Sequence, residues 1–265
     1  RKGKTPNPCA FCNKHAKFFY LYNEMLKFNA DYIATGHYSE IINDNGNLYV
    51  TKAKDEKKDQ SYYLSLVKRE FLERTIFPLS KLEKTEVRKI ASEIGLPVAE
   101  KKDSQEICFL DGGDYRDYLR NKIDPRKIKK GDFIYNGKVI GKHDGIEFYT
   151  VGQRRGLGIG YHENLYVEKI DMETNNITLT NSKGNGYRGV SLIECNFFNN
   201  EKRLFRANAK LRYRMKESDC LVELLPDNRA ALLFDKPQQF PAPGQVAAIY
   251  RDDFLIGGGY IEGVF

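Results

Sequence analysis

The sequence contains no run of about 18 or more apolar residues, the length that a helix needs to cross a bilayer. Its first residues, Arg-Lys-Gly-Lys, do not lead into the apolar stretch of a secretory signal. Cysteine is also sparse: five cysteines, arranged as one close pair and three single residues, make a poor disulfide framework. We therefore expect a cytoplasmic protein with reduced thiols and no membrane partner.

The composition favours several compact units. A chain of 265 residues with 41% hydrophobic residues is long enough for two or three domains with a core each. Helix-like and strand-like segments alternate up to about residue 122, and short β-like runs separated by Gly, Asn and Asp follow. No internal repeat or low-complexity linker interrupts them. We predict an α/β domain over 1–122, a central β domain over 123–189 and a second β domain over 190–265.

Four local elements are predicted within the first domain. Residues 18–26 have the apolar spacing of a helix, which we expect to begin near Asn13, and residues 31–36 read as a short buried strand. Asn43-Asp44-Asn45-Gly46 is typical of a hairpin loop. Residues 87–94 have one apolar helical face, and Gly95 supplies a stop signal.

The formal charge of +7 is concentrated in two clusters, at 116–130 and at 202–216. In the second cluster Lys210, Arg212, Arg214 and Lys216 alternate with apolar residues. A strand here would place these four cations on one face, which could follow a phosphate backbone. The alternative is a solvated strand face without a ligand.

Cys9 and Cys12 form a Cys-x-x-Cys pair in Thr-Pro-Asn-Pro-Cys-Ala-Phe-Cys-Asn. At the positive end of a helix, their thiol pKa values would be lowered. The pair alone also fits half a zinc site, a redox pair or packing, although no second Cys-x-x-Cys completes a four-thiolate site. Cys108, Cys195 and Cys220, each taken alone, fit buried core cysteines.

Three further segments carry polar groups that suit ligand binding. Gly36 ends the predicted strand, and His37 and Tyr38 lie just past its carboxyl end, where α/β folds place ligand contacts, although a structural histidine is nearly as good an interpretation. The segment 149–160 combines Arg154 and Arg155 with closely spaced glycines, which suits phosphates but also plain turns. A third segment can read and stack on a base, or begin a helix through a capping side chain; it consists of Lys58, Asp59, Gln60, Ser61 and Tyr62.

Taken together, these segments resemble the bacterial tRNA-specific 2-thiouridylase family. The matching motifs are Thr-Pro-Asn-Pro-Cys-x-x-Cys-Asn at 5–13, Ala-Thr-Gly-His-Tyr at 34–38, Lys-Asp-Gln-Ser-Tyr at 58–62, Asp-Ser-Gln-Glu-Ile-Cys-Phe at 103–109 and Tyr-Thr-Val-Gly-Gln-Arg-Arg-Gly-Leu-Gly at 149–158. Their order and spacing agree with the family over about 150 residues. The resemblance implies the C-terminal part of a Rossmann-like PP-loop ATPase domain, followed by two small β-barrel-like domains.

The resemblance also implies a reaction. ATP, with Mg²⁺, would adenylate the C2 oxygen of the wobble uridine in the tRNA anticodon region, and a cysteine persulfide would then displace AMP. Cys108 would carry the persulfide, and Cys12 would act as acid/base or resolving nucleophile. A cysteine desulfurase or a relay protein would supply the sulfur. Gly36 and His37 would neighbour the nucleotide, and RNA would contact Lys58, Asp59, Gln60, Ser61, Tyr62, Arg154, Arg155, Lys210, Arg212 and Arg214.

Two departures from the family pattern modify this expectation. The family's Ser-Gly-Gly-Val-Asp-Ser nucleotide loop is absent, so Arg1 would lie inside the nucleotide domain, and the chain alone is expected neither to bind ATP tightly nor to thiolate RNA. Cys9 stands where some relatives have Asp. Cys9, Cys12 and Cys108 would then be able to hold an iron-sulfur cluster for sulfide transfer. A noncatalytic tRNA-binding fragment and a structural zinc module are the rival hypotheses.

Overall fold

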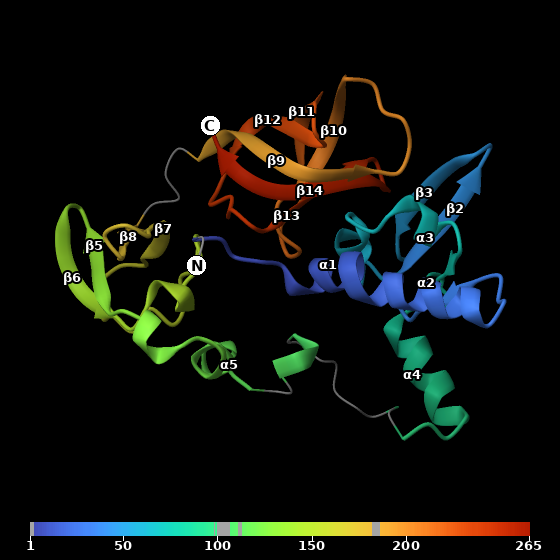
Figure 1. Ribbon diagram of the computed structural model, residues 1–265, viewed down its shortest axis with the longest axis horizontal. Coiled ribbons are helices and arrows are strands. Elements are labelled where there is room, and N and C mark those ends of the chain that lie inside the picture. Colours follow the sequence, from blue (N-terminus) through green and yellow to red (C-terminus); the bar gives the residue numbers. More distant parts are fainter. Residues whose placement is uncertain (1–2, 98, 100–106, 111–112, 182–185) are drawn as a thin grey trace.

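The computed structural model describes residues 3–97, 99, 107–110, 113–181 and 186–265. Figure 1 shows three parts: an α/β part around α2 and β2, a barrel above it, and a separate small sheet around β5 and β6. None of the helices in these described ranges is long and apolar enough to cross a membrane.

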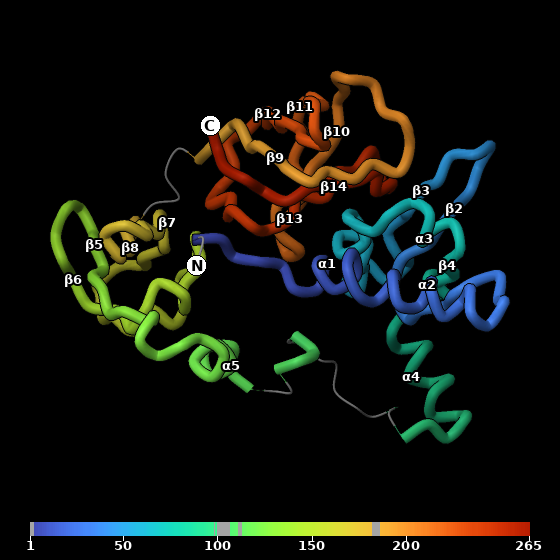
Figure 2. The backbone as a smooth tube through the Cα atoms, in the orientation of Figure 1, coloured from blue at the N-terminus to red at the C-terminus, as the bar shows by residue number. Residues whose placement is uncertain are grey.

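The α/β part begins with one long helical segment. α1 (Pro8–Cys12) continues through a π-helical stretch (η1, Asn13–Lys17) into α2 (Phe18–Lys27). The segment starts at Pro8 rather than near Asn13, because the Asn7 side chain accepts from the backbone N–H of Ala10 and proline suits the first helical position. Figure 2 shows the stretch before α1 running alongside the barrel, where the Thr5 N–H donates to the Pro243 carbonyl at 2.8 Å.

Short strands complete the α/β part. β1 (Ile33–Ala34) pairs in parallel with β4 (Thr75–Ile76), and β2 (Ser39–Asp44) pairs with β3 (Asn47–Lys52) as a hairpin. Asn45 and Gly46 have φ values of 49° and 79°, as a type I′ turn requires, so the predicted hairpin is confirmed. Two short helices, η2 (Ser61–Leu64) and α3 (Arg69–Leu72), lie between β3 and β4.

The second predicted helix is also present, as α4 (Lys84–Glu93). It stops where expected, with Gly95 at φ 73°. None of its residues is buried, and Ile90 and Ile94 on the apolar face remain exposed.

The C-terminal strands form an antiparallel barrel. They are β9 (Tyr187–Phe197), β10 (Leu204–Lys210), β11 (Ser218–Leu225), β12 (Arg229–Gln238), β13 (Val246–Arg251) and β14 (Phe254–Val264). Their order is β13-β10-β11-β12-β9-β14, and pairing between β13 and β14 closes the barrel. β3 adds to β14 with Thr51 opposite Phe254, so the hairpin of the α/β part extends the barrel sheet.

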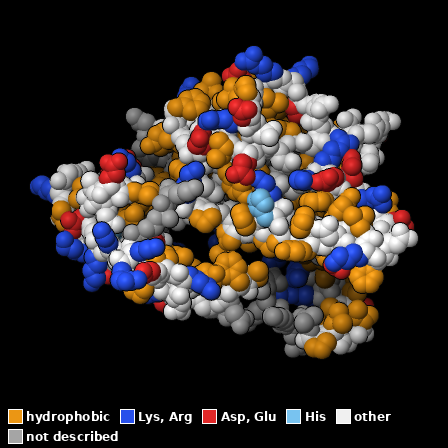
Figure 3. Space-filling view, in the orientation of Figure 1, with side chains coloured by type: hydrophobic (Ala, Val, Ile, Leu, Met, Phe, Trp, Pro, Cys, Tyr) orange, Lys and Arg blue, Asp and Glu red, His pale blue; other side chains and the backbone are white. Residues whose placement is uncertain are grey.

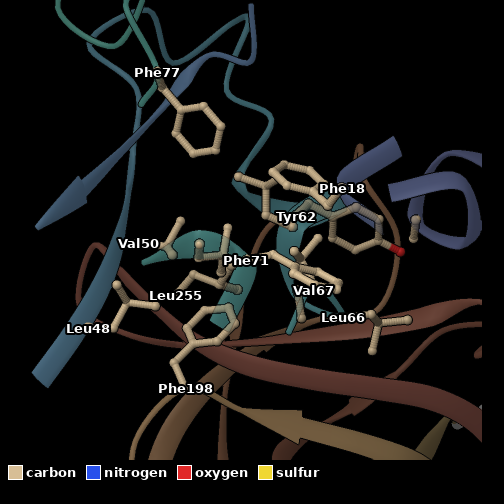
Figure 4. Packing of buried hydrophobic residues seen from close by; sticks show 14 of the residues in the cluster. Phe18, Leu48, Val50, Tyr62, Leu66, Val67, Phe71, Phe77, Phe198 and Leu255 are labelled. Carbon is tan, nitrogen blue, oxygen red and sulfur yellow. The ribbon is translucent and has the colours of Figure 1, made fainter. Parts of the chain in front are cut away.

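One hydrophobic core joins the α/β part to the barrel. Figure 4 shows Phe18 and Tyr62 packed in one cluster with Phe198 and Leu255 of the barrel. The Tyr62 hydroxyl, fully buried, donates to the carbonyl of Val246 on β13 at 2.8 Å. These two parts therefore form one packing unit.

The central β part has a core of its own. Its sheet runs β6 (Lys138–His143), β5 (Gly131–Tyr135), β8 (Asn176–Thr180), β7 (Tyr166–Asp171), with β5 and β8 parallel and the other pairs antiparallel. Phe133 and Ile177 are fully buried in this core. Short 3₁₀ helices lie before and within this part, namely η4 (Pro125–Lys127) and η5 (Ile146–Phe148), whereas η3 (Cys108–Leu110) precedes it in the chain.

α5 (Tyr115–Lys122) is attached to this central part. The Tyr115 hydroxyl donates to the Phe148 carbonyl at 2.6 Å, and the Arg116 guanidinium donates to the Gly156 carbonyl at 2.7 Å. By these contacts α5 packs on the central part, although it precedes residue 122, where the sequence predicts the domain boundary.

Candidate functional site

A cavity of about 850 Å³ lies between the α/β part, the barrel and η3. It brings together ten of the predicted site residues. They are Cys9, Cys12, Cys108, Gly36, His37, Lys58, Asp59, Gln60, Lys210 and Arg214. The motifs that lie far apart in the sequence therefore meet at one site.

The three thiols of the cavity differ in exposure. Cys9, in the first turn of α1, and Cys12, its last residue, are half-buried, whereas Cys108 at the start of η3 is exposed. The exposure of Cys108 contradicts a core role. The first four residues of its motif, 103–106, lie outside the described residues.

The helix start does not lower the pKa of the Cys9 thiol as the sequence predicts. Burial raises this pKa, and the nearby Cys108 raises it further, while Lys17 acts in the opposite direction. Desolvation of the thiolate thus outweighs the helix end. Cys195 and Cys220 agree with structural roles, because both pack in the barrel core and burial raises the pKa of each to about 12.

His37 lies in the cavity wall in a fixed position. It is buried between the rings of Phe18 and Phe77, at 5.6 and 5.7 Å. Its Nδ1 is 2.6 Å from the Thr35 hydroxyl and its Nε2 is 3.5 Å from Lys17 Nζ. Burial, together with the charge of Lys17, lowers the pKa of His37 to about 3, so the ring is neutral and accepts from Lys17 through Nε2.

This buried histidine predicts acid sensitivity. The folded-state pKa is depressed, so the unfolded chain takes up a proton first and stability falls as the pH drops from about 6.5 towards 3. Between pH 7.5 and 4.5 the contribution is about 2.5 kcal/mol. In urea titrations His37→Gln should lose correspondingly less stability over this range. His162→Gln, at an exposed position, should behave as the wild type; equal losses in all three proteins would contradict the assignment.

The segment 58–62 divides between the cavity and the core. The Asp59 carboxylate accepts from the N–H groups of Ala53 and Ser61 at 3.3 and 3.1 Å and from the Ser61 hydroxyl at 2.9 Å. Ser61 and Tyr62 are fully buried, so the structure places these two predicted RNA-binding side chains in the core and not at the cavity surface. The alternative that Asp59 caps the following turn agrees with its bond to the Ser61 N–H.

Lys58 and Gln60 remain at the cavity surface. The Gln60 Oε1 accepts from the Tyr38 N–H at 3.0 Å, and the Gln60 N–H donates to the Tyr38 carbonyl at 2.8 Å. These bonds fix the side chain beside the thiols.

The predicted strand face with four cations does not form. β10 ends at Lys210, and residues 211–215 turn back, with the Met215 N–H donating to the Arg212 carbonyl at 3.0 Å. Lys210 and Arg214 line the cavity, but Arg212 points inward and donates to the carbonyls of Val151 and Phe240. Arg212, predicted to contact RNA, therefore lies outside the cavity, and its guanidinium joins the barrel to the central part.

Removing the Arg212 guanidinium should destabilise the protein. Arg212→Met keeps the aliphatic stem and leaves two carbonyls without their donor, which costs about 2–3 kcal/mol. Arg214→Met is the matched control, since its exposed side chain should change the free energy of unfolding by less than about 0.5 kcal/mol. Chemical denaturation measures both, and equal small effects would show that the carbonyl bonds contribute little.

Arg154 and Arg155 lie outside the cavity, on an exposed loop of the central part. Gly152 and Gly156 in this loop have φ values of 80° and 72°, as glycine turns require. Figure 3 shows Lys and Arg side chains gathered over the central part. Several cations in the 116–130 cluster are paired locally, such as Arg120 with Asp117 and Arg126 with Asp124.

Metal ligands do not gather in the described part of the chain, where no three His, Cys, Asp or Glu side chains are placed to hold an ion. Although Cys9, Cys12 and Cys108 share the cavity, their arrangement does not fit a three-thiolate cluster. His15, the one histidine near the cysteine pair in sequence, packs against Phe11 with ring centroids 4.5 Å apart.

Known proteins match the chain over nearly all its length. Three family models cover consecutive parts: the tRNA methyl transferase HUP domain at 1–112, the tRNA methyl transferase PRC-barrel domain at 116–181 and the aminomethyltransferase beta-barrel domain at 188–261. The chain is 41% identical to the tRNA-specific 2-thiouridylase MnmA of Chlorobium phaeobacteroides, over 99% of this chain and 75% of the relative. It is 43% identical to that of Pelotomaculum thermopropionicum, over 98% of this chain and 72% of the relative.

The chain belongs to the tRNA-specific 2-thiouridylase family. This confirms the resemblance stated from the five motifs, and with it an α/β domain of the HUP type followed by two barrel domains. In this 2-thiouridylase family member, the HUP model covers Cys9, Cys12 and Cys108, and the third model covers Lys210 and Arg214. The cavity is thus assembled from two domains of the family.

The sequence reasoning missed several cavity residues of this 2-thiouridylase family member. They are Asn13, Lys17, Glu56, Lys57, Tyr63, Lys84 and Tyr213. Tyr63 directly follows the motif at 58–62, and Tyr213 lies inside the second basic cluster. The position of each residue in the sequence could therefore have indicated that it lies at the site. Lys17 had no such signal in the sequence; the structure places its Nζ 3.5 Å from His37 Nε2.

Proposed function

We propose that this protein makes 2-thiouridine in tRNA, acting as a tRNA sulfurtransferase. The observation that carries the proposal is the meeting of Cys12 and Cys108 in one cavity, beside the anchored Gln60. Family membership supports it, because relatives at 41–43% identity are named tRNA-specific 2-thiouridylases.

The exposed Cys108 suits a persulfide carrier. Its thiol is accessible to a sulfur donor such as a cysteine desulfurase or a relay protein, and a persulfide formed there would lie in the cavity that Cys12 also lines. The terminal sulfur attacks C2 of the uridine and the activated C2 oxygen leaves. Cys12, as thiolate, then attacks the Cys108 sulfur, breaks the S–S bond and leaves the transferred sulfur on the base.

These reaction steps leave a disulfide bond between Cys12 and Cys108. Two electrons from an external thiol reductant are needed before the next cycle. Alternatively, Cys12 acts as acid/base and a different thiol releases the sulfur. Both routes require Cys12 and Cys108 to approach each other. Their position in the lining of the same cavity supports this.

The cavity also suits a nucleoside triphosphate. Gly36 and His37 lie just past β1, at the carboxyl end of the parallel strand pair, where α/β folds bind nucleotides. The cavity lining has more cations than carboxylates: Lys17, Lys57, Lys58, Lys84, Lys210 and Arg214 against Glu56 and Asp59. ATP with Mg²⁺, when bound, would convert the uridine C2 oxygen into a leaving group. The residues of this chain would orient its phosphates.

An iron-sulfur cluster does not fit the described residues, so we derive no step from one. Cys9 in this proposal is a neighbour of the reacting thiols, and its raised pKa keeps it as a neutral thiol. Anaerobic purification followed by iron analysis tests the alternative directly.

The tRNA would approach across the basic residues around and beside the cavity. Lys58, Lys210 and Arg214 lie at the cavity, and Arg154 and Arg155 lie on the exposed loop of the central part. Phosphate contacts of this kind position an RNA without reading its sequence. The uridine of the anticodon region must leave its stack to enter.

Gene deletion tests the proposed function. In the source organism, loss of the gene should remove 2-thiouridine from digested tRNA, as measured by mass spectrometry, and re-expression should restore it. An unchanged 2-thiouridine level in the deletion strain, with tRNA binding retained by the purified protein, would leave RNA binding alone as the function.

A further inference from the structure

An aromatic pair from two domains lies in the wall of the thiol cavity. Tyr63 of η2 and Tyr213 of the turn after β10 stack with centroids 4.6 Å apart and planes inclined by 30°. Both side chains are half-buried and both line the cavity with Cys9 and Cys12. The barrel therefore reaches into the site through Tyr213.

The backbone on either side of this pair is anchored. The Asn13 side-chain amide, one residue after Cys12, donates to the Tyr63 carbonyl at 3.1 Å. On the other side, Arg212 anchors the turn that carries Tyr213 through its bonds to the Val151 and Phe240 carbonyls. These bonds fix the backbone that carries each ring, and the stacking of the two rings on each other holds the side chains in the wall.

Cations accompany the Tyr213 ring. Lys210 Nζ lies 5.7 Å from its centroid, and the exposed Arg214 follows it in the same turn. An aromatic ring beside two cations is the combination by which proteins bind a single nucleotide, with the base on the ring and the phosphate on the cations.

We propose that Tyr213, with Lys210 and Arg214, forms the subsite that holds the extruded target nucleotide. The base lies against the Tyr63–Tyr213 wall beside the thiols, and its phosphate contacts the two cations. This rests on the proposed function and adds to it that the C-terminal barrel supplies the base-stacking residue.

Packing between domains is the competing role for the pair, because both rings touch the shared core. The two roles differ in their response to a substitution that keeps an apolar side chain but removes the aromatic ring. Tyr213→Leu preserves apolar packing but removes the π-face, whereas Tyr213→Phe preserves both. Tyr20→Leu, at an exposed aromatic of α2 outside the cavity, is the matched control.

Binding of a short single-stranded RNA with one central uridine, measured by fluorescence anisotropy, tests the proposal. We expect Tyr213→Leu to weaken binding about 5- to 150-fold, because stacking contributes about 1–3 kcal/mol per base. The salt dependence should stay unchanged, whereas Lys210→Met should reduce the slope by about 0.7. Tyr213→Phe and Tyr20→Leu should bind as the wild type.

The same RNA without the central base completes a double-mutant cycle. Wild-type protein should lose as much affinity for the abasic RNA as Tyr213→Leu loses for the intact RNA, and the variant should lose nothing further. Equal losses from base removal in wild type and variant overturn the proposal, whatever the thermal stability of the variant. If the cycle holds while Cys108→Ser keeps normal thiouridine synthesis, the subsite stands and the proposed chemistry falls.

Discussion

Cells whose copy of this protein carries Cys108→Ser should lose 2-thiouridine from their tRNA to the background of a deletion strain. A serine hydroxyl cannot form a persulfide, so the sulfur has no carrier in the cavity. Cys108 is exposed and begins a short helix, so the substitution should leave folding unchanged. Nucleoside mass spectrometry measures the product, and a thermal melt of the purified variant checks the fold.

Cys195→Ser is the matched control for this result. Cys195 lies in the barrel and is packed against its core, away from the residues that line the cavity. It should retain normal 2-thiouridine. Normal levels in Cys108→Ser would remove Cys108 as sulfur carrier and would leave Cys12 or Cys9 to be tested in the same strain background.

Phe198→Ala should destabilise the α/β part and the barrel together, by about 3–5 kcal/mol. The ring is buried at 1% exposure in the core that also contains Phe18 and Tyr62, and its loss leaves a cavity between the two parts. Hydrogen exchange should accelerate both in the β2–β3 hairpin and in β13–β14. These segments share the sheet through the pairing of β3 with β14.

Phe133→Ala is the corresponding change in the central part. Its ring lies in a separate core, so exchange should accelerate in β5–β8 and stay unchanged in the barrel. Acceleration confined to the barrel in Phe198→Ala would show that the α/β part does not depend on the shared core.

Local chemistry made parts of the fold predictable. The hairpin followed from Asn45-Gly46, whose positive φ values only a few residue types adopt, and the end of α4 followed from Gly95. The addition of β3 to the barrel was not predictable, because it pairs residues some 200 positions apart and depends on packing rather than on local sequence.

The site was predictable where a motif kept its residues together. Cys12, Cys108 and Gln60 were named from motif register, and the structure places them in one cavity. The roles of Ser61 and Arg212 were not predictable. A polar residue or an alternating pattern in the sequence does not show which side chains are buried by the packing of another domain. Tyr62 was predicted to contact RNA, yet its hydroxyl donates a hydrogen bond to the carbonyl of Val246 in the barrel.

The central claim is that sulfur passes from Cys108 to the uridine while Cys12 lies in the same cavity. It is tested most directly by loading the full-length gene product with a ³⁴S-labelled persulfide and following one ATP-dependent turnover on tRNA by mass spectrometry. We predict that the label moves from the Cys108 peptide to the 2-thiouridine, and that a Cys12–Cys108 disulfide forms in equal amount if Cys12 resolves the persulfide. Unlabelled thiouridine formed while the label stays on Cys108 would contradict the claim.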